Sequence, residues 1–200
     1  MTTILSKTKV DSDGIKAWRE RVGEAEAQRI MKEAAERGSI MHEMLERYVH
    51  TDNFDTPAHD APIAHKMANL IISKGFIYLD EIWGIEQNIA YPNEYAGTMD
   101  CVGVYRKKPT IIDFKQTNKP KREEWVEDYY LQLTAYICAH EKQYGKIEGG
   151  TILMASTGLV FQEFDLSGSK LDEYKDKWWK RVEQFKTNHA QPLQGSLQKA

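Results

Sequence analysis

Acidic side chains and one lysine lie inside the most apolar, strand-forming part of this chain, and this pattern constrains the fold more than any other feature. Glu86 lies in the run 82–91, and Asp100 begins the run 100–105. Asp113 and Lys115 lie in the run 110–115, and all three runs are rich in β-branched or aromatic residues. Burying such charges is costly unless they pair with one another or bind a metal ion. The pattern therefore predicts a sheet whose charged residues converge on one site.

Alternation along these strands predicts where the charged side chains point. Successive side chains lie on opposite faces of a strand, so Asp113 and Lys115 share one face. The four residues 106–109 are expected to form a hairpin turn that brings Asp100 beside Asp113. Glu86 is expected on the face of its strand opposite Trp83, Ile85, Ile89 and Tyr91. Three carboxylates and a lysine are thus expected to converge from three antiparallel strands.

These residue types fit the hydrolysis of a phosphodiester bond. That reaction needs a divalent cation, an activated water and stabilisation of developing negative charge, and carboxylate oxygens are ligands that Mg²⁺ and Mn²⁺ prefer. A lysine beside the ion can orient the water or help to remove its proton. The competing interpretation is a surface salt bridge between Asp113 and Lys115. A Gly-x-x-Asp pattern upstream and a Gln-x-x-x-Tyr pattern downstream favour the catalytic interpretation.

Together, the motifs resemble those of PD-(D/E)XK nucleases of the RecB exonuclease type. The matching residues are Glu86, Gly97-Thr98-Met99-Asp100, Ile111-Ile112-Asp113-Phe114-Lys115 and Gln132-Leu133-Thr134-Ala135-Tyr136. The resemblance spans roughly 18–164 and is specific from 97 to 136. Gln116 is a departure, because many relatives carry threonine directly after the lysine. Thr117 can take that place, so the role of Gln116 stays open.

The resemblance implies a role for each motif residue. Asp100 and Asp113 are expected to hold one or two Mg²⁺ or Mn²⁺ ions, and Glu86 to complete the site. The backbone carbonyl of Phe114 is a further expected ligand, and Lys115 is expected to assist the attacking water.

His42 is a further ligand candidate, from the amino-terminal half. Ser39 is a good N-cap, so a helix is expected to begin there. The apolar residues at helical spacing in it are Met41, Met44, Leu45, Tyr48 and Val49. A lone histidine at the edge of such a stripe is usually a packing residue. The segment Arg37-Gly38-Ser39-x-x-His42 resembles the first motif of RecB-type nucleases, in which the histidine contacts the metal, and this favours a ligand.

Basic residues gather around the proposed catalytic strand, although the chain has a formal net charge of −3. Residues 106–122 hold seven basic residues and one acid, a net of +6 that leaves −9 for the rest. A phosphate-binding rim is therefore favoured over an ordinary solvated loop. The expected DNA-binding residues are Arg37, Lys119, Lys121, Arg122, Trp125, Gln132 and Tyr136. Trp125 either stacks on an unpaired base or packs against the sheet. For Gln132 and Tyr136, the resemblance implies that the pair orients Lys115 and lines the DNA groove. The alternative is that Gln132 is an ordinary solvent-exposed residue and Tyr136 a core residue.

Cysteine content and hydropathy exclude other classes. Cys101 and Cys138 are too few for the four-thiolate iron–sulfur cluster of some RecB-type relatives. Both are expected to be buried thiols in a reducing cytoplasm, bacterial or of a phage-infected cell. There is no run of about 18 apolar residues to span a membrane, and the first residues match neither a signal peptide nor a transit sequence. Expected partners are DNA, single-stranded by resemblance, and other recombination or replication proteins.

The order of elements predicts an α/β fold, a central mixed β-sheet flanked by helices with a restriction-endonuclease-like core. A length of 200 residues favours one domain, here a nuclease domain at 1–187 before a flexible tail at 188–200. Residues 52–61 are expected to form a loop. Helices are expected near 13–36, 39–50, 61–74, 123–144 and 168–187. Strands are expected near 77–91, 98–106, 109–116, 149–156 and 159–165.

The sequence thus predicts a metal-dependent DNA exonuclease that prefers single-stranded ends and acts in replication, repair or recombination. The preference for ends and for single strands follows from the resemblance alone. One alternative is a structure-specific or flap endonuclease with the same site, and another is a catalytically idle DNA-binding module. The intact set of Asp100, Asp113 and Lys115 argues against the idle module, because binding alone does not require it.

Overall fold

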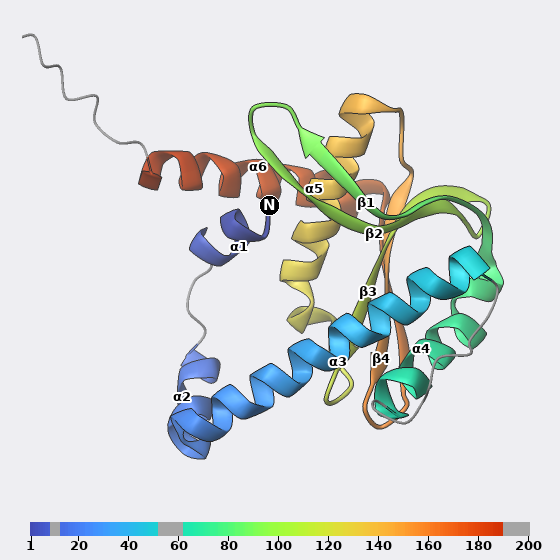
Figure 1. Ribbon diagram of the computed structural model, residues 1–200. Helices are drawn as coiled ribbons and strands as arrows, with labels where there is room; N and C mark the ends of the chain where they lie inside the picture. Colours follow the sequence, from blue (N-terminus) through green and yellow to red (C-terminus); the bar gives the residue numbers. More distant parts are fainter. Residues whose placement is uncertain (9–12, 52–61, 190–200) are drawn as a thin grey trace, which may run out of the picture.

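Five strands form one mixed sheet with helices on both sides in the computed structural model, which describes residues 1–8, 13–51 and 62–189 (Figure 1). The elements are α1 (Thr2–Thr8), α2 (Asp13–Val22), α3 (Glu24–Thr51), α4 (Pro62–Lys74), η1 (Phe76–Tyr78), β1 (Leu79–Tyr91), β2 (Tyr95–Tyr105), β3 (Lys108–Thr117), η2 (Glu123–Trp125), α5 (Glu127–Gln143), β4 (Gly149–Ser156), β5 (Phe161–Ser167) and α6 (Gly168–His189). The strand order is β1-β2-β3-β4-β5, with only β3 and β4 parallel. The predicted α/β class is confirmed, and the topology is consistent with a restriction-endonuclease-like core.

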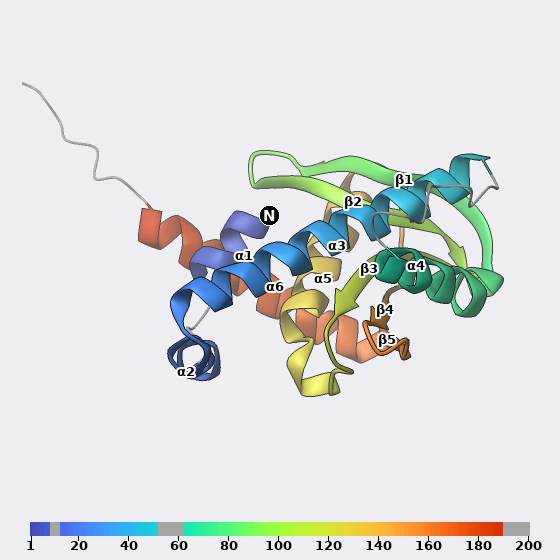
Figure 2. The same ribbon diagram turned by 60° about the horizontal axis from the view of Figure 1, so that its bottom comes forward.

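Helices lie on both faces of the sheet (Figures 1 and 2), and each face has its own hydrophobic core. α3 and α4 cover one face, where the core includes Met41, Leu45, Ile71, Ile112 and Phe114. α5, backed by α6 and α1, covers the other, where the core includes Ile111, Leu133, Ile137 and Trp178. Ile111 and Ile112 divide between the two cores because successive side chains of β3 point to opposite faces. None of the described helices is long and apolar enough to cross a membrane.

The amino-terminal helices break at a different place from the one predicted. Gly23 separates α2 from α3, and its φ of 84° is a left-handed conformation that glycine adopts without strain. Gly38 and Ser39 lie inside α3, so the predicted N-cap at Ser39 is wrong. A glycine within a helix costs about 1 kcal/mol relative to alanine, which the buried packing of α3 against the sheet outweighs.

Other boundaries differ by smaller amounts. α1 was not predicted, and the helix expected from 123 begins as the short η2 before α5 starts at Glu127. The predicted loop at 52–61 lies outside the described residues, as does the predicted tail from 190 onward, whereas 188 and 189 belong to α6.

Two positive φ angles at the β2–β3 turn and one in β1 shape the catalytic strands. Arg106 and Lys107, at φ 48° and 67°, form a two-residue turn, shorter than the predicted four. Glu86 has φ 47°. Ile85 and Ile89, expected on one face, therefore pack in opposite cores. This break in alternation directs Glu86 toward α3, on the same side as Ile85 and not opposite it.

Candidate active site

The pairing of β2 with β3 ends beside the predicted site. The last backbone pair is Cys101 with Ile112. At the next position, Asp100 Oδ2 accepts the Phe114 N–H at 2.7 Å, so a side chain takes the place of a backbone partner. β3 continues in parallel pairing with β4. The strands therefore separate where the carbonyl oxygen of Phe114 faces the site.

Three side chains from three elements meet at this opening. His42, on α3, has its Nδ1 3.0 Å from Glu86 Oε1 and 3.8 Å from Asp100 Oδ1. Its Nε2 lies 3.0 Å from the carbonyl oxygen of Phe114. One ligand atom from each of His42, Glu86 and Asp100 lies within 4.8 Å of the others. A neutral imidazole carries one N–H and cannot donate to both oxygens, so this arrangement suits an imidazolium or a bound cation.

Asp113 and Lys115 form a buried ion pair next to this cluster. Asp113 is fully buried, with Oδ2 2.6 Å from Lys115 Nζ. Neither Asp113 oxygen has a hydrogen-bond partner of regular geometry among the described residues. The ammonium also lies 5.3 Å from the ring centroid of Tyr129 on α5. The pair is therefore not the surface salt bridge weighed as an alternative, and Asp113 Oδ1 remains an unsatisfied buried acceptor.

The site holds more negative than positive charge. Three carboxylates, on Glu86, Asp100 and Asp113, oppose the single ammonium of Lys115, which leaves a net charge of −2 when His42 is neutral. Burial, and then the charge of Asp113, raise the pKa of Asp100 to about 7. Burial opposes charge on His42, but the hydrogen bond that its Nδ1–H donates to Glu86 and the charge of Asp100 outweigh burial and raise the histidine pKa.

Lys115 keeps its proton in this environment. Burial alone would lower its pKa, but the charges of Asp113 and Asp100 outweigh burial and raise the pKa above the ordinary lysine value. An ammonium of this kind can donate hydrogen bonds and stabilise negative charge, but it is a poor acceptor for a proton. Of the two roles predicted for it, orienting the water fits the structure and removing its proton does not.

The residues present fit a divalent metal ion. The 3.0 Å contact from His42 Nδ1 to Glu86 Oε1 matches the spacing of adjacent ligands in an octahedron with bonds of about 2.1 Å. The Phe114 carbonyl lies at the other ring nitrogen, Nε2, which is placed to donate a hydrogen bond to it. Carboxylate and carbonyl oxygens with one imidazole suit Mn²⁺ and Mg²⁺, and a charge of +2 would neutralise the site. The cluster of possible ligands, His42, Glu86 and Asp100, does not include Asp113. Asp113 Oδ1, which has no hydrogen-bond partner among the described residues, offers a further ligand nearby.

A side-chain network anchors α3 to the catalytic strand. Gln116 accepts a hydrogen bond from Arg37 Nε at 3.0 Å and donates one to the carbonyl oxygen of Ala34 at 2.9 Å. Arg37 Nη2 also donates to Asn118 Oδ1 at 2.5 Å. Gln116, whose role the sequence left open, thus fixes the helix that carries His42 against the strand that carries Lys115. In the sequence, only its position directly after Lys115 hinted at this function.

On α5, beneath the site, the positions of Gln132 and Tyr136 agree only in part with the prediction that both contact DNA. Gln132 Nε2 donates to Tyr136 Oη at 3.3 Å, so the two residues do form a pair. Tyr136 is only 3% exposed, however, and packs under β2. A Cβ on Gly97 would lie 3.1 Å from Met1 Cε and 3.3 Å from the Tyr136 ring, so a larger residue there would require these side chains to shift. Tyr136 therefore supports the floor of the site and does not line a DNA groove, whereas half-buried Gln132 still reaches the surface.

The basic loop after β3 lies beside the anchored end of α3. Arg37 contacts it through Asn118, and Arg37, Lys119 and Lys121 have no ion-pair partner among the described residues. The arginine that follows, Arg122, lies 5.3 Å from the Trp125 ring and makes only an exposed contact with an acid. Trp125 is 55% exposed, so it does not pack against the sheet. These residues form a cationic rim with one open aromatic ring.

Comparison with curated proteins finds relatives that are named as exonucleases. The chain matches no protein-family model. Its relatives include mitochondrial genome maintenance exonuclease 1 of Xenopus tropicalis, 32% identical over 100 residues, and the human protein of that name, 31% identical over 96 residues. Each alignment covers 46% of this chain and 28% of the relative. The chain therefore spans less than a third of the length of the curated relatives it matches.

A crystal structure of a proposed exonuclease from Eubacterium rectale is also similar. It has a TM-score of 0.48 and 14% identity, and the match covers 74% of this chain and 65% of that one.

Proposed function

We propose that this chain is a Mg²⁺- or Mn²⁺-dependent DNA exonuclease of the PD-(D/E)XK type that prefers single-stranded ends. The observation that carries the proposal is the site itself, where His42, Glu86 and Asp100 converge beside the buried pair of Asp113 and Lys115. A structural role alone does not explain a net negative charge and an unsatisfied acceptor in a buried position.

The residues divide the work of hydrolysis among them. His42, through Nδ1, would hold the ion together with Glu86 and Asp100, and the ion would supply Lewis-acid activation of water and neutralisation of charge. The Nε2–H of His42 would donate to the Phe114 carbonyl and orient the ring. The protonated amine of Lys115 orients the attacking water by hydrogen bonding and stabilises the negative charge that develops on the phosphate. Asp113 holds this amine in place through its 2.6 Å contact.

The rim supports DNA as the substrate. Arg37, Lys119 and Lys121, which pair with no acid in the described part of the chain, offer positive charge to phosphates, and Trp125 offers a ring on which an unpaired base can stack. The homologues named as genome maintenance exonucleases support DNA as the polymer and an end as the point of attack. The proposal includes action in replication, repair or recombination, which is compatible with the words genome maintenance in those names.

A nuclease assay that compares linear and circular single strands of equal length tests this proposal. In Mn²⁺ or Mg²⁺, the linear strand is expected to be degraded and the circle to resist, because an exonuclease requires an end. A duplex of the same sequence is expected to be cut more slowly. Rapid cutting of the circle would show the alternative, an endonuclease with the same catalytic residues. No cutting of any of these under either ion would favour the idle DNA-binding module.

A further inference from the structure

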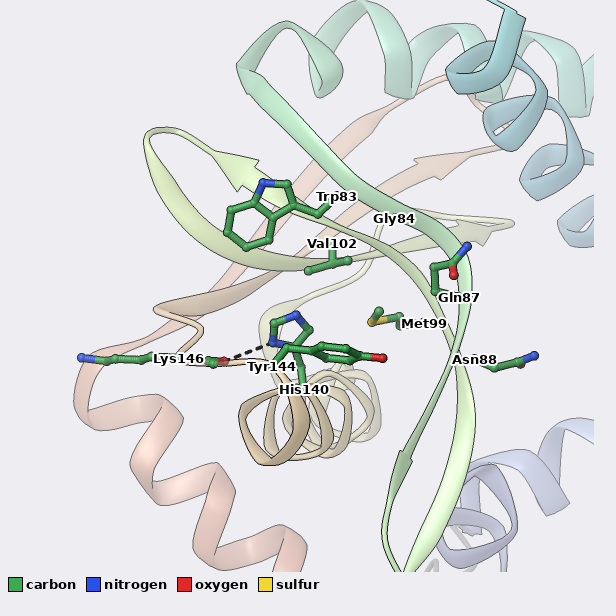
Figure 3. Close-up of a pocket in the computed structure, with 10 residues that line it drawn as sticks. Trp83, Gly84, Gln87, Asn88, Met99, Val102, His140, Tyr144 and Lys146 are labelled. Carbon is green, nitrogen blue, oxygen red and sulfur yellow. Dashed lines mark hydrogen bonds between the residues drawn. The ribbon is translucent and has the colours of Figure 1, made fainter.

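A cavity of about 520 Å³ is lined by residues of the β1–β2 hairpin and of the end of α5 (Figure 3). Gln87 and Met99, which line it, are register partners on β1 and β2. The residues next to them in the chain, Glu86 and Asp100, point to His42. Met99 packs in the core under α5, whereas His42 is on α3. The cavity and the catalytic site therefore share two strands but open on opposite faces.

Two aromatic side chains bound this cavity and remain open to solvent. Trp83 is 50% exposed, and its indole N–H donates to Glu81 Oε2 at 2.9 Å, which fixes the ring plane. Tyr144 is 69% exposed and follows the end of α5, with its N–H bonded to the His140 carbonyl at 2.8 Å. Figure 3 shows Trp83 on one side of the space and Tyr144 on the other. Such an arrangement suits a flat ring that stacks on aromatic side chains.

His140 supplies a polar group directed into the same space. It is 7% exposed, and its Nδ1 lies 3.2 Å from the carbonyl oxygen of Gly145. A carbonyl only accepts hydrogen bonds, so Nδ1 carries the proton and Nε2 is an acceptor. Nε2 has no partner among the described residues, and Figure 3 shows the ring directed toward Val102 and Trp83. This acceptor therefore faces the cavity, and a ligand with an N–H group could donate a hydrogen bond to it.

We propose that this cavity binds a nucleobase. The ring would lie between Trp83 and Tyr144, its N–H edge would donate to His140 Nε2, and Met99 and Val102 would contact its apolar surface. Lys146 at the rim would accept the attached phosphate. The volume falls in the range of small-molecule sites, about 300–1,000 Å³. The base would come either from a DNA strand that crosses the edge strand β1 or from a free nucleotide. The first source rests on the proposed nuclease function, and the second does not.

A binding experiment in EDTA, where metal-dependent cleavage is suppressed, distinguishes a base of a DNA strand from a free nucleotide. One probe is dAMP, titrated by calorimetry, and the other is a linear single strand with one 2-aminopurine, whose fluorescence falls on stacking. The variants are Trp83→Ala and Tyr144→Ala, which are solvent-exposed changes that preserve the fold. Ile77→Ala is the matched control, because Ile77 is 65% exposed and lies outside the cavity.

Binding of dAMP that weakens at least tenfold in both cavity variants, and not in Ile77→Ala, establishes a free-nucleotide site. Loss of 2-aminopurine quenching in the same variants without any dAMP binding establishes a base of the strand. In either case, a purine analogue that lacks the exocyclic amine is expected to bind several-fold more weakly, because it cannot donate to His140. If neither probe distinguishes the cavity variants from the control, the proposal is wrong. Absence of nuclease activity with base binding retained would overturn the proposed function and leave this site standing.

Discussion

At the scale of single residues, the central feature is a lysine that is both buried and charged. The Asp-x-Lys spacing predicted that Asp113 and Lys115 share a face, and the 2.6 Å ion pair confirms it. The sequence could not show that Asp113 is fully buried, because burial depends on how α5 packs over β3. Burial distinguishes a catalytic pair from an exposed one, whose contribution to stability is small.

Replacing Lys115 separates chemistry from binding. Lys115→Met, of similar volume, is expected to lower the cleavage rate at saturating Mn²⁺ by a factor of about 10² or more, since a charge that stabilises the transition state is lost. The affinities for Mn²⁺ and for single-stranded DNA are expected to stay within a few-fold. Lys180→Met, at an exposed position on α6, serves as the control. Near-normal turnover of Lys115→Met would remove the role given to this amine.

At the scale of elements, the site depends on how α3 is held against β3. The apolar stripe in 41–49 predicted a helix that packs on the sheet, and Met41, Met44 and Leu45 are buried as expected. The continuity of α3 through Gly38 was not predictable from local signals, because glycine and serine are typical of helix ends. Tertiary packing overrides that preference, and the amide network at Gln116 fixes the position of the helix.

Replacing Gln116 tests whether its side chain holds α3 against β3. Gln116→Ala eliminates the hydrogen bonds to Arg37 and to the Ala34 carbonyl, so the free energy of unfolding is expected to fall by about 1–2 kcal/mol. Mn²⁺ affinity is expected to fall several-fold because His42 is held less firmly, while the rate at saturating Mn²⁺ changes little. Gln28→Ala is the control, since its hydrogen bond to Glu24 is exposed and lies within α3. Equal Mn²⁺ affinity in both variants would contradict the anchoring role.

The basic loop after β3 is a second element with a measurable role. Joint replacement of Lys119 and Lys121 by alanine in EDTA is expected to weaken binding of single-stranded DNA at low salt. The slope of log affinity against log salt is expected to become shallower by about one unit per lost phosphate contact. Joint replacement of Lys74 and Lys180 by alanine, at exposed positions on α4 and α6, provides a control of equal charge change. An unchanged slope in the double variant would show that this loop is not part of the DNA interface.

At the scale of the whole molecule, the sequence predicted all five strands, the α/β class and the residues that converge. These features follow from patterns within single strands and from the short β2–β3 turn. Other features depend on contacts between distant segments and could not be read locally. Glu86, for example, reaches His42 because its φ of 47° breaks the alternation of β1. The cavity between Trp83 and Tyr144 is a further example, because it forms only where the end of α5 lies beside β1.

The most direct measurement of the central claim is the cleavage of an end-labelled linear single strand of DNA in Mn²⁺, compared with EDTA. The wild-type protein is expected to shorten the strand only with the metal. Asp100→Asn is expected to be inactive, because it removes one charge from the His42–Glu86–Asp100 cluster, while keeping the wild-type circular dichroism spectrum. Cleavage by pure protein that survives EDTA, or full activity of Asp100→Asn in Mn²⁺, would contradict a metal-dependent nuclease site at this position.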